Sequence, residues 1–161
     1  MPKYHYRYRK PQRRHFPVRL ALVLLALLAL CIYPFIEART LTVDEHTVQV
    51  ANLPANLKNL KIVYATDIHQ GRWFSQSRVN ELVKTINGLS ADLVILGGDY
   101  AEDSDGAIEF FENLPSISAR IGVYAVLGNH DRTEPESNLS VLIGTIKGRG
   151  IIPLVNNVAA V

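Results

Sequence analysis

A short apolar run followed by an amphipathic helical pattern recurs three times between residues 61 and 148, and this repetition constrains the fold more than any other feature. The apolar runs lie at residues 61–66, 92–96 and 121–127 and are rich in Val and Ile. Buried parallel strands have this composition, because both of their faces are covered. A fourth strand is expected to begin near Ile151. Before the repeats, residues 40–50 alternate between apolar and polar positions, as in a short hairpin.

Each apolar run is followed by apolar residues at positions i, i+3, i+4 and i+7, the pattern of a helix with one buried face. The three sets are Val79, Leu82, Val83 and Ile86, then Ala107, Phe110, Phe111 and Leu114, then Leu139, Leu142, Ile143 and Ile146. We expect Ser77, Asp105 and Asn138 to cap the N-termini of these helices. Strands that alternate with amphipathic helices predict an α/β fold, with a mostly parallel sheet and helices packed on its faces.

Polar residues follow each predicted strand at the point where it ends. They are Asp67 and His69 after the first strand, Gly98-Asp99 after the second, and Gly128-Asn129-His130-Asp131 after the third. Taken alone, Asp67 and His69 could be capping or surface residues, and each of the two glycine-containing motifs is also typical of a turn. However, Asp67, Asp99 and Asn129 recur at intervals of 32 and 30 residues, which is about one strand–helix unit. Because the carboxyl ends of the strands line the ligand crevice in open α/β sheets, we expect these side chains to meet at one rim.

Carboxylate, amide and imidazole groups gathered at one rim are suitable ligands for divalent ions. A carboxylate on the middle strand, here Asp99, can bridge two ions that the flanking strands also hold. Two such ions, roughly 3.5–4 Å apart, can clamp a phosphoryl group and activate water at neutral pH. His130 could donate a proton or stabilise the transition state, with Asp131 orienting its ring. The pattern therefore indicates metal-dependent phosphoryl chemistry.

These motifs resemble the first three signature blocks of the calcineurin-like metallophosphoesterases. The lead-in from residue 60, which follows an apolar segment, is similar to the small membrane-anchored bacterial branch of that family. The resemblance covers about residues 41–161. It implies the N-terminal half of a four-layer α/β/β/α sandwich, with the site at its edge.

The resemblance also implies a role for each matching residue. Asp67 and His69 would hold a first metal ion, Asp99 would bridge, and Asn129 would hold a second ion. His130 would act on the substrate phosphate, and a metal-activated hydroxide would attack it. The substrate would be a phosphomonoester, phosphodiester or pyrophosphate. The two ions would be manganese, iron or zinc, all of which suit these ligands.

The later signature blocks of that family contain further histidines, and none of the five histidines here follows His130. We therefore expect a metallophosphoesterase domain at residues 40–161 that is incomplete at its C-terminus and impaired in activity. Either a truncated gene or a naturally short protein that borrows ligands from a partner would account for this. The alternative is a non-catalytic membrane protein that carries a decayed metallophosphoesterase fold.

The N-terminal part of the chain predicts a transmembrane signal anchor. Residues 20–36 are seventeen residues without a charge, close to the length of a membrane-spanning helix. Residues 1–19 form a basic tail with seven basic side chains and no acidic one. The positive-inside rule then places the tail in the cytoplasm and the phosphoesterase domain outside it. A cleaved signal peptide is the alternative to an anchor. Export could follow either the twin-arginine or the general secretory route.

Charge and cysteine content exclude several classes of protein. Residues 20–161 carry a net charge of −5, which argues against a nucleic-acid-binding domain. The single cysteine, Cys31, excludes an intramolecular disulfide and a cysteine-based zinc site. The expected partners are the membrane bilayer and a phosphorylated substrate, either lipid-linked or derived from the envelope. Arg72, Trp73 and Tyr100 could contact that substrate or could be ordinary loop residues.

Overall fold

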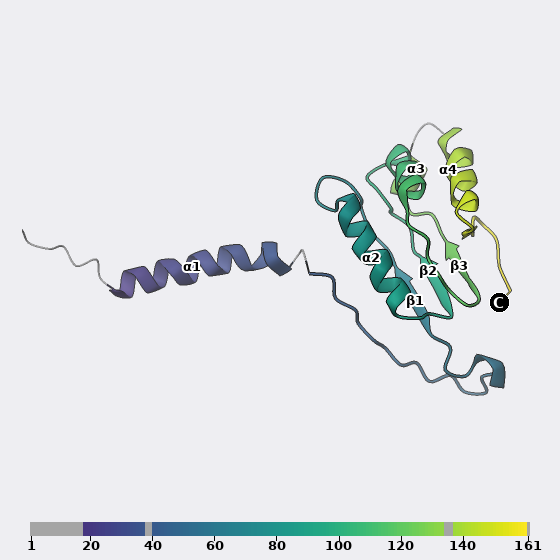
Figure 1. Cartoon of the computed structure of the whole chain (residues 1–161), viewed down its shortest axis with the longest axis horizontal. Coiled ribbons are helices and arrows are strands. Elements are labelled where there is room, and N and C mark those ends of the chain that lie inside the picture. The colour runs from purple at the N-terminus through teal and green to yellow at the C-terminus, as the bar shows by residue number, and fades with distance from the viewer. Residues whose placement is uncertain (1–17, 38–39, 134–136, 161) are drawn as a thin grey trace, which may run out of the picture. The chain divides into compact units, whose positions relative to one another are not determined.

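The computed structural model describes residues 18–37, 40–133 and 137–160, which form two units, one ending at residue 47 and one beginning at residue 48 (Figure 1). The first unit contains helix α1 (Val18–Glu37). The second contains η1 (Ala55–Leu57), β1 (Ile62–Ala65), α2 (Gln76–Gly88), β2 (Leu93–Leu96), α3 (Ser104–Asn113), β3 (Gly122–Ala125), η2 (His130–Arg132), α4 (Ser137–Gly148) and β4 (Ile152–Pro153). The predicted basic tail lies outside the described residues, apart from its last two positions.

Helix α1 includes the whole uncharged run at residues 20–36. It is long and apolar enough to cross a membrane, and none of its side chains is buried. A signal sequence near the N-terminus would have the same length and composition. An N-terminal apolar helix is therefore confirmed, whereas its role as an anchor stays a prediction.

The second unit is built on a four-stranded parallel sheet with the order β1-β2-β3-β4. This confirms the α/β fold expected from the alternation of strands and helices. Every crossover moves to the next strand in the same direction. Because such crossovers are nearly always right-handed, successive helices fall on the same side of the sheet.

The register of the strands shows which face of the sheet is covered. Two rows of paired residues, Val63–Val94–Val123 and Ala65–Leu96–Ala125, pack with the apolar residues of α2, α3 and α4 into one core. On the opposite face, Tyr64 pairs with Ile95 and is 62% exposed. The sequence predicted helices on the faces of the sheet, and the described helices cover one of them.

Two further expectations differ from the structure. Residues 40–50 form no strand, and Val48 is 80% exposed, so the predicted hairpin is wrong. An alternating pattern stabilises a hairpin only when one of its faces is buried. The helices also begin earlier than predicted. The N-cap of α3 is Asp103, whose carboxylate accepts the N–H of Gly106 at 2.8 Å, and that of α2 is Ser75.

Candidate metal centre

Three of the predicted site residues have a left-handed backbone conformation. The φ angles of Asp67, His69 and Asp99 are 53°, 45° and 54°. This conformation costs roughly 1–2 kcal/mol for a residue with a side chain, although Asp tolerates it better than most. Such strain persists only where the surrounding structure imposes it, and it clusters at functional sites.

Backbone hydrogen bonds beyond the ends of β1 and β2 impose this geometry. Gly97 donates its N–H to the carbonyl of Ala65 at 2.7 Å, and Asp67 donates to Gly98 at 3.0 Å. His69 then donates to the carbonyl of Asp99 at 3.0 Å. The pairing of the two strands therefore continues into their loops and brings His69 beside Asp99. The described strands contain no reversal of strand order, so the site forms along these paired loops instead of in a crevice between diverging strands.

Asp131 fixes the loop after β3 to the loop after β2. Its side chain is completely buried, with an exposed fraction of 0%. Its carboxylate accepts three backbone N–H groups, from Asp99 at 2.8 Å, Tyr100 at 3.0 Å and Gly128 at 2.8 Å. The sequence predicted that Asp131 orients the ring of His130. The hydrogen bonds of its carboxylate show that it holds the backbone around Asp99.

His130 is held from two sides. Its backbone N–H donates to Oδ1 of Asp99 at 3.0 Å, and its Nδ1 lies 2.9 Å from the carbonyl oxygen of Glu102. A carbonyl can only accept, so Nδ1 carries the proton in this contact. The Nε2 atom is then the ring nitrogen available to an ion or a substrate. This hydrogen bond to Glu102 raises the pKa of His130 above its ordinary value, and the nearby carboxylates act in the same direction.

His69, Asp99 and His130 together form a cluster that could hold a metal ion. One donor atom from each residue lies within 4.8 Å of the others. The two imidazole rings are 5.0 Å apart and nearly perpendicular. The Glu102 carboxylate lies 3.8 Å from Nδ1 of His69, where it can act as an outer partner to a metal-binding histidine. Two imidazoles and a carboxylate fit manganese, iron or zinc.

The remaining predicted residues lie around this cluster. Asp67 lies outside the three-residue set, and Asn129 is exposed at the N-terminal end of η2. Sequence reasoning missed Glu102, which follows Asp99 by three residues and contacts both histidines. Its charge and its place after a strand were the only available signals.

Tyr100 belongs to the core and does not line the site. Its side chain is fully buried, and its hydroxyl lies 2.6 Å from the carbonyl of Val126. The ring stacks on Phe110 and meets Phe111 edge-on. Burial raises the pKa of Tyr100 well above its ordinary value. Tyr100 is therefore neither a substrate contact nor an ordinary exposed loop residue. Its buried ring supports the loop after β2 from the core side.

We expect Gly128→Ala to destabilise the second unit and to weaken metal binding. A Cβ at Gly128 would overlap the carboxylate of Asp99 and lie 2.7 Å from its backbone nitrogen. Overpacking of this kind costs about 1–3 kcal/mol. Urea denaturation followed by far-UV circular dichroism measures the loss.

Gly144→Ala is the matched control. Apart from its chain neighbours and the backbone of its own helix, no atom lies within 4 Å of a Cβ built at Gly144, which sits inside α4. Alanine is favoured over glycine in a helix by roughly 0.5–1 kcal/mol, so this variant should be slightly more stable. Equal stabilities for the two variants would contradict the close packing of Gly128 against Asp99.

The chain is similar to known phosphoesterases. Residues 60–158 match the family model of the calcineurin-like phosphoesterases. A zebrafish (Danio rerio) transmembrane protein with metallophosphoesterase domain is 32% identical over 114 residues, which are 70% of this chain and 26% of that protein. An uncharacterized metallophosphoesterase of Campylobacter jejuni is 30% identical over 111 residues, 68% of this chain and 29% of that protein. One of Bacillus subtilis is 26% identical over 100 residues, 60% of this chain and 35% of that protein.

The chain therefore spans about a quarter to a third of the length of these curated relatives. The matched residues include the whole sheet and every member of the His69, Asp99 and His130 cluster. On this basis the chain belongs to the calcineurin-like phosphoesterase family, whose members are metal-dependent hydrolases that act on phosphate esters.

Proposed function

We propose that this chain forms part of a membrane-anchored, metal-dependent phosphoesterase that hydrolyses phosphomonoester, phosphodiester or pyrophosphate bonds. The observation that carries the proposal is the cluster of His69, Asp99 and His130, whose donor atoms lie within 4.8 Å of one another. Membership of a hydrolase family supports the same chemistry.

In the proposed site, Asp67, His69, Asp99 and Asn129 would hold two divalent ions. Such ions would supply polarisation of the phosphoryl group and a lowered pKa for the attacking water. Asp99 is suited to the central position because the loops after β1 and β3 both bond to it. Its Oδ1 accepts the N–H of His130. The carboxylate of Asp99 can therefore serve as a metal ligand and also align the loop after β3.

We assign the proton transfer to Nε2 of His130. The carbonyl of Glu102 holds the proton on Nδ1, which fixes the tautomer and the ring orientation. His130 can donate a proton from Nε2 to a phosphoryl oxygen or to the leaving group, so in this proposal it is the proton donor beside the ions and not one of their ligands. Asp131 acts as a positioning residue, since its carboxylate holds the backbone of Asp99.

We propose that α1 anchors a phosphoesterase domain at residues 40–161 in the bilayer. The basic residues of the tail at 1–19 favour a cytoplasmic N-terminus and an extracytoplasmic domain. The zebrafish relative is named as a transmembrane protein, which supports membrane anchoring. The similarity to bacterial metallophosphoesterases supports placing the chain beside the bacterial members of the family. A tether of this kind favours phosphorylated substrates at the membrane or in the envelope.

Hydrolysis of an aryl phosphodiester by the full chain tests the proposed function. We expect a low rate, because the described residues contain one group of three donors that could hold an ion. The rate should require Mn²⁺, fall to background with a chelator, and be absent in Asp99→Asn. A rate that survives chelation or this substitution would refute the assignment. If the chain neither binds metal nor hydrolyses the phosphodiester, the result would favour the non-catalytic alternative.

A further inference from the structure

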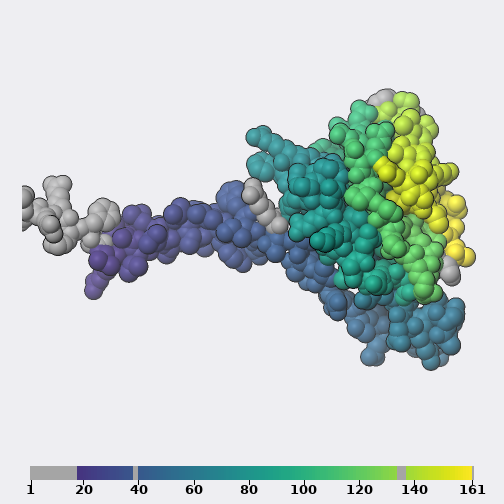
Figure 2. Space-filling view, viewed as in Figure 1, coloured from purple at the N-terminus to yellow at the C-terminus, as the bar shows by residue number. Residues whose placement is uncertain are grey.

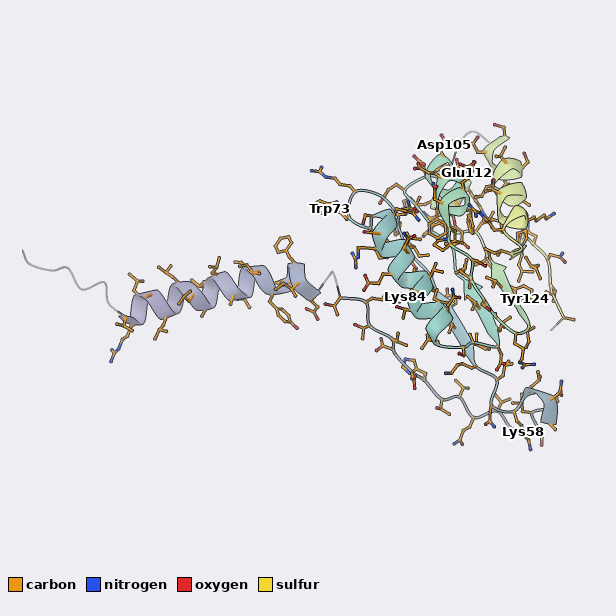
Figure 3. The ribbon with its side chains drawn as sticks, viewed as in Figure 1. Lys58, Trp73, Lys84, Asp105, Glu112 and Tyr124 are labelled. Carbon is orange, nitrogen blue, oxygen red and sulfur yellow. The ribbon has the colours of Figure 1, made fainter. Side chains whose placement is uncertain are left out.

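The loop between β1 and α2 exposes an aromatic side chain at its tip. Trp73 is the only tryptophan of the chain, and 80% of its side chain is exposed (Figure 3). The guanidinium of Arg72 lies 5.4 Å from the centre of the indole ring. In the space-filling view, this part of the second unit projects from its surface (Figure 2). A single exposed aromatic side chain is common on protein surfaces, so its exposure alone does not indicate a partner. The case for a contact rests on how the loop is held and where it lies.

The loop is held in place on both sides of the tip. The backbone N–H of Gly71 donates to the carbonyl of Phe74 at 3.0 Å, which closes a turn around Arg72 and Trp73. Phe74 packs against the core, and the guanidinium of Arg78 lies 4.4 Å from the centre of its ring. The exposure of Trp73 is therefore imposed by an anchored turn.

The tip also rises beside the candidate metal centre. Gln70, next to His69, donates its backbone N–H to the carbonyl of Tyr100 at 2.8 Å. A Cβ built at Gly71 would lie 3.9 Å from the side chain of Glu102. Whatever the tip contacts is consequently brought close to His69 and Glu102.

We propose that Arg72 and Trp73 dock the second unit onto the interface of a lipid bilayer. The amphipathic indole of tryptophan is favoured at the level of the lipid headgroups. An arginine beside it can pair with a lipid phosphate. The net charge of −5 over residues 20–161 opposes broad attraction to an anionic surface, so the contact is confined to this tip.

This docking rests on the proposed anchoring by α1. Ten residues, 38–47, separate α1 from the second unit, and ten residues span at most about 35 Å. A tether this short keeps the second unit, and with it the tip, at a high effective concentration near the bilayer, whereas the contact itself depends on the orientation of that unit. A contact made by two side chains can then be populated, although it would be too weak between untethered molecules.

Fluorescence of the single tryptophan tests the docking in the full chain. The protein would be reconstituted into phosphatidylcholine vesicles, with and without lipids brominated in the upper part of the acyl chain. We expect a blue shift of the Trp73 emission, quenching by the brominated lipids, and protection from aqueous iodide. Arg72→Glu should reduce the lipid quenching several-fold. Lys84→Glu, an equal charge reversal on the exposed surface of α2, should leave it unchanged (Figure 3).

Vesicle flotation separates the docking from the anchoring. If the chain floats with the vesicles and iodide still quenches Trp73, the docking is refuted and the anchoring stands. A chain that does not float refutes both. Equal quenching in Arg72→Glu and Lys84→Glu would also refute the docking by this pair. None of these measurements depends on phosphoesterase activity, so failure of the proposed enzyme function would be seen separately.

Discussion

Asp99→Asn is expected to weaken Mn²⁺ binding by at least about 100-fold, because loss of an outer-shell partner alone costs about 10–100-fold. Asp99 is the only carboxylate in the cluster with His69 and His130. The amide of asparagine keeps an oxygen that can accept the N–H of His130, which is now 3.0 Å from Oδ1 of Asp99. The substitution should therefore weaken the binding of the ion and leave the fold intact. Isothermal titration with Mn²⁺ measures the affinity, and far-UV circular dichroism checks the fold.

Asp92→Asn is the matched control for this loss of a carboxylate. Asp92 accepts the backbone N–H of Lys61 and pairs with Arg120, and these two contacts lower its pKa. It lies immediately before β2, at the opposite end of that strand from Asp99. We expect Mn²⁺ affinity to be unchanged in this variant. A similar loss of affinity in both variants, or in neither, would contradict the assignment of Asp99 as the central ligand.

The positions of the strands and of the site residues could be predicted because both depend on local patterns. An apolar run such as residues 92–96 shows where a buried strand lies, and β2 forms at Leu93–Leu96. Asp99 follows the end of this strand by three residues, and its place at the carboxyl edge follows from parallel pairing alone. The resemblance to the family motifs identified the same site residues independently.

The contacts that complete the site could not be predicted, because they join residues about thirty positions apart. The carboxylate of Asp131 bonds to the backbone of Asp99 and Tyr100, which lie on another loop. Nothing in the order of residues shows that Glu102 bonds to His130 through its carbonyl oxygen. The left-handed conformation of Asp67 likewise depends on its bond to the carbonyl of Gly98.

The face of the sheet that the helices cover also could not be predicted from local sequence patterns. Periodicity identified the apolar side of each helix, and it could not show on which face of the sheet that side packs. The face follows from the order β1-β2-β3-β4, in which every crossover has the same direction. Strand order is a property of the whole chain, so local patterns leave it undetermined.

Asp131→Ala is expected to lower the free energy of unfolding by about 2–4 kcal/mol, because each backbone N–H left without a partner costs about 1–3 kcal/mol when buried. Three N–H groups lose their acceptor, and the one from Tyr100 is fully buried. The loop that carries Asp99 would also lose its support, so Mn²⁺ affinity should fall with stability. Urea denaturation followed by far-UV circular dichroism measures the stability.

Two further variants show whether the buried carboxylate acts in this way. Asp131→Asn keeps one acceptor oxygen, so its stability should lie between those of the wild type and Asp131→Ala. Asp103→Ala removes a carboxylate that accepts a single exposed N–H, from Gly106, and such a cap is worth about 1 kcal/mol. Wild-type stability in Asp131→Ala, combined with lost hydrolysis, would contradict the structural role. It would return Asp131 to the role that its motif suggests, which is to orient His130 during the reaction.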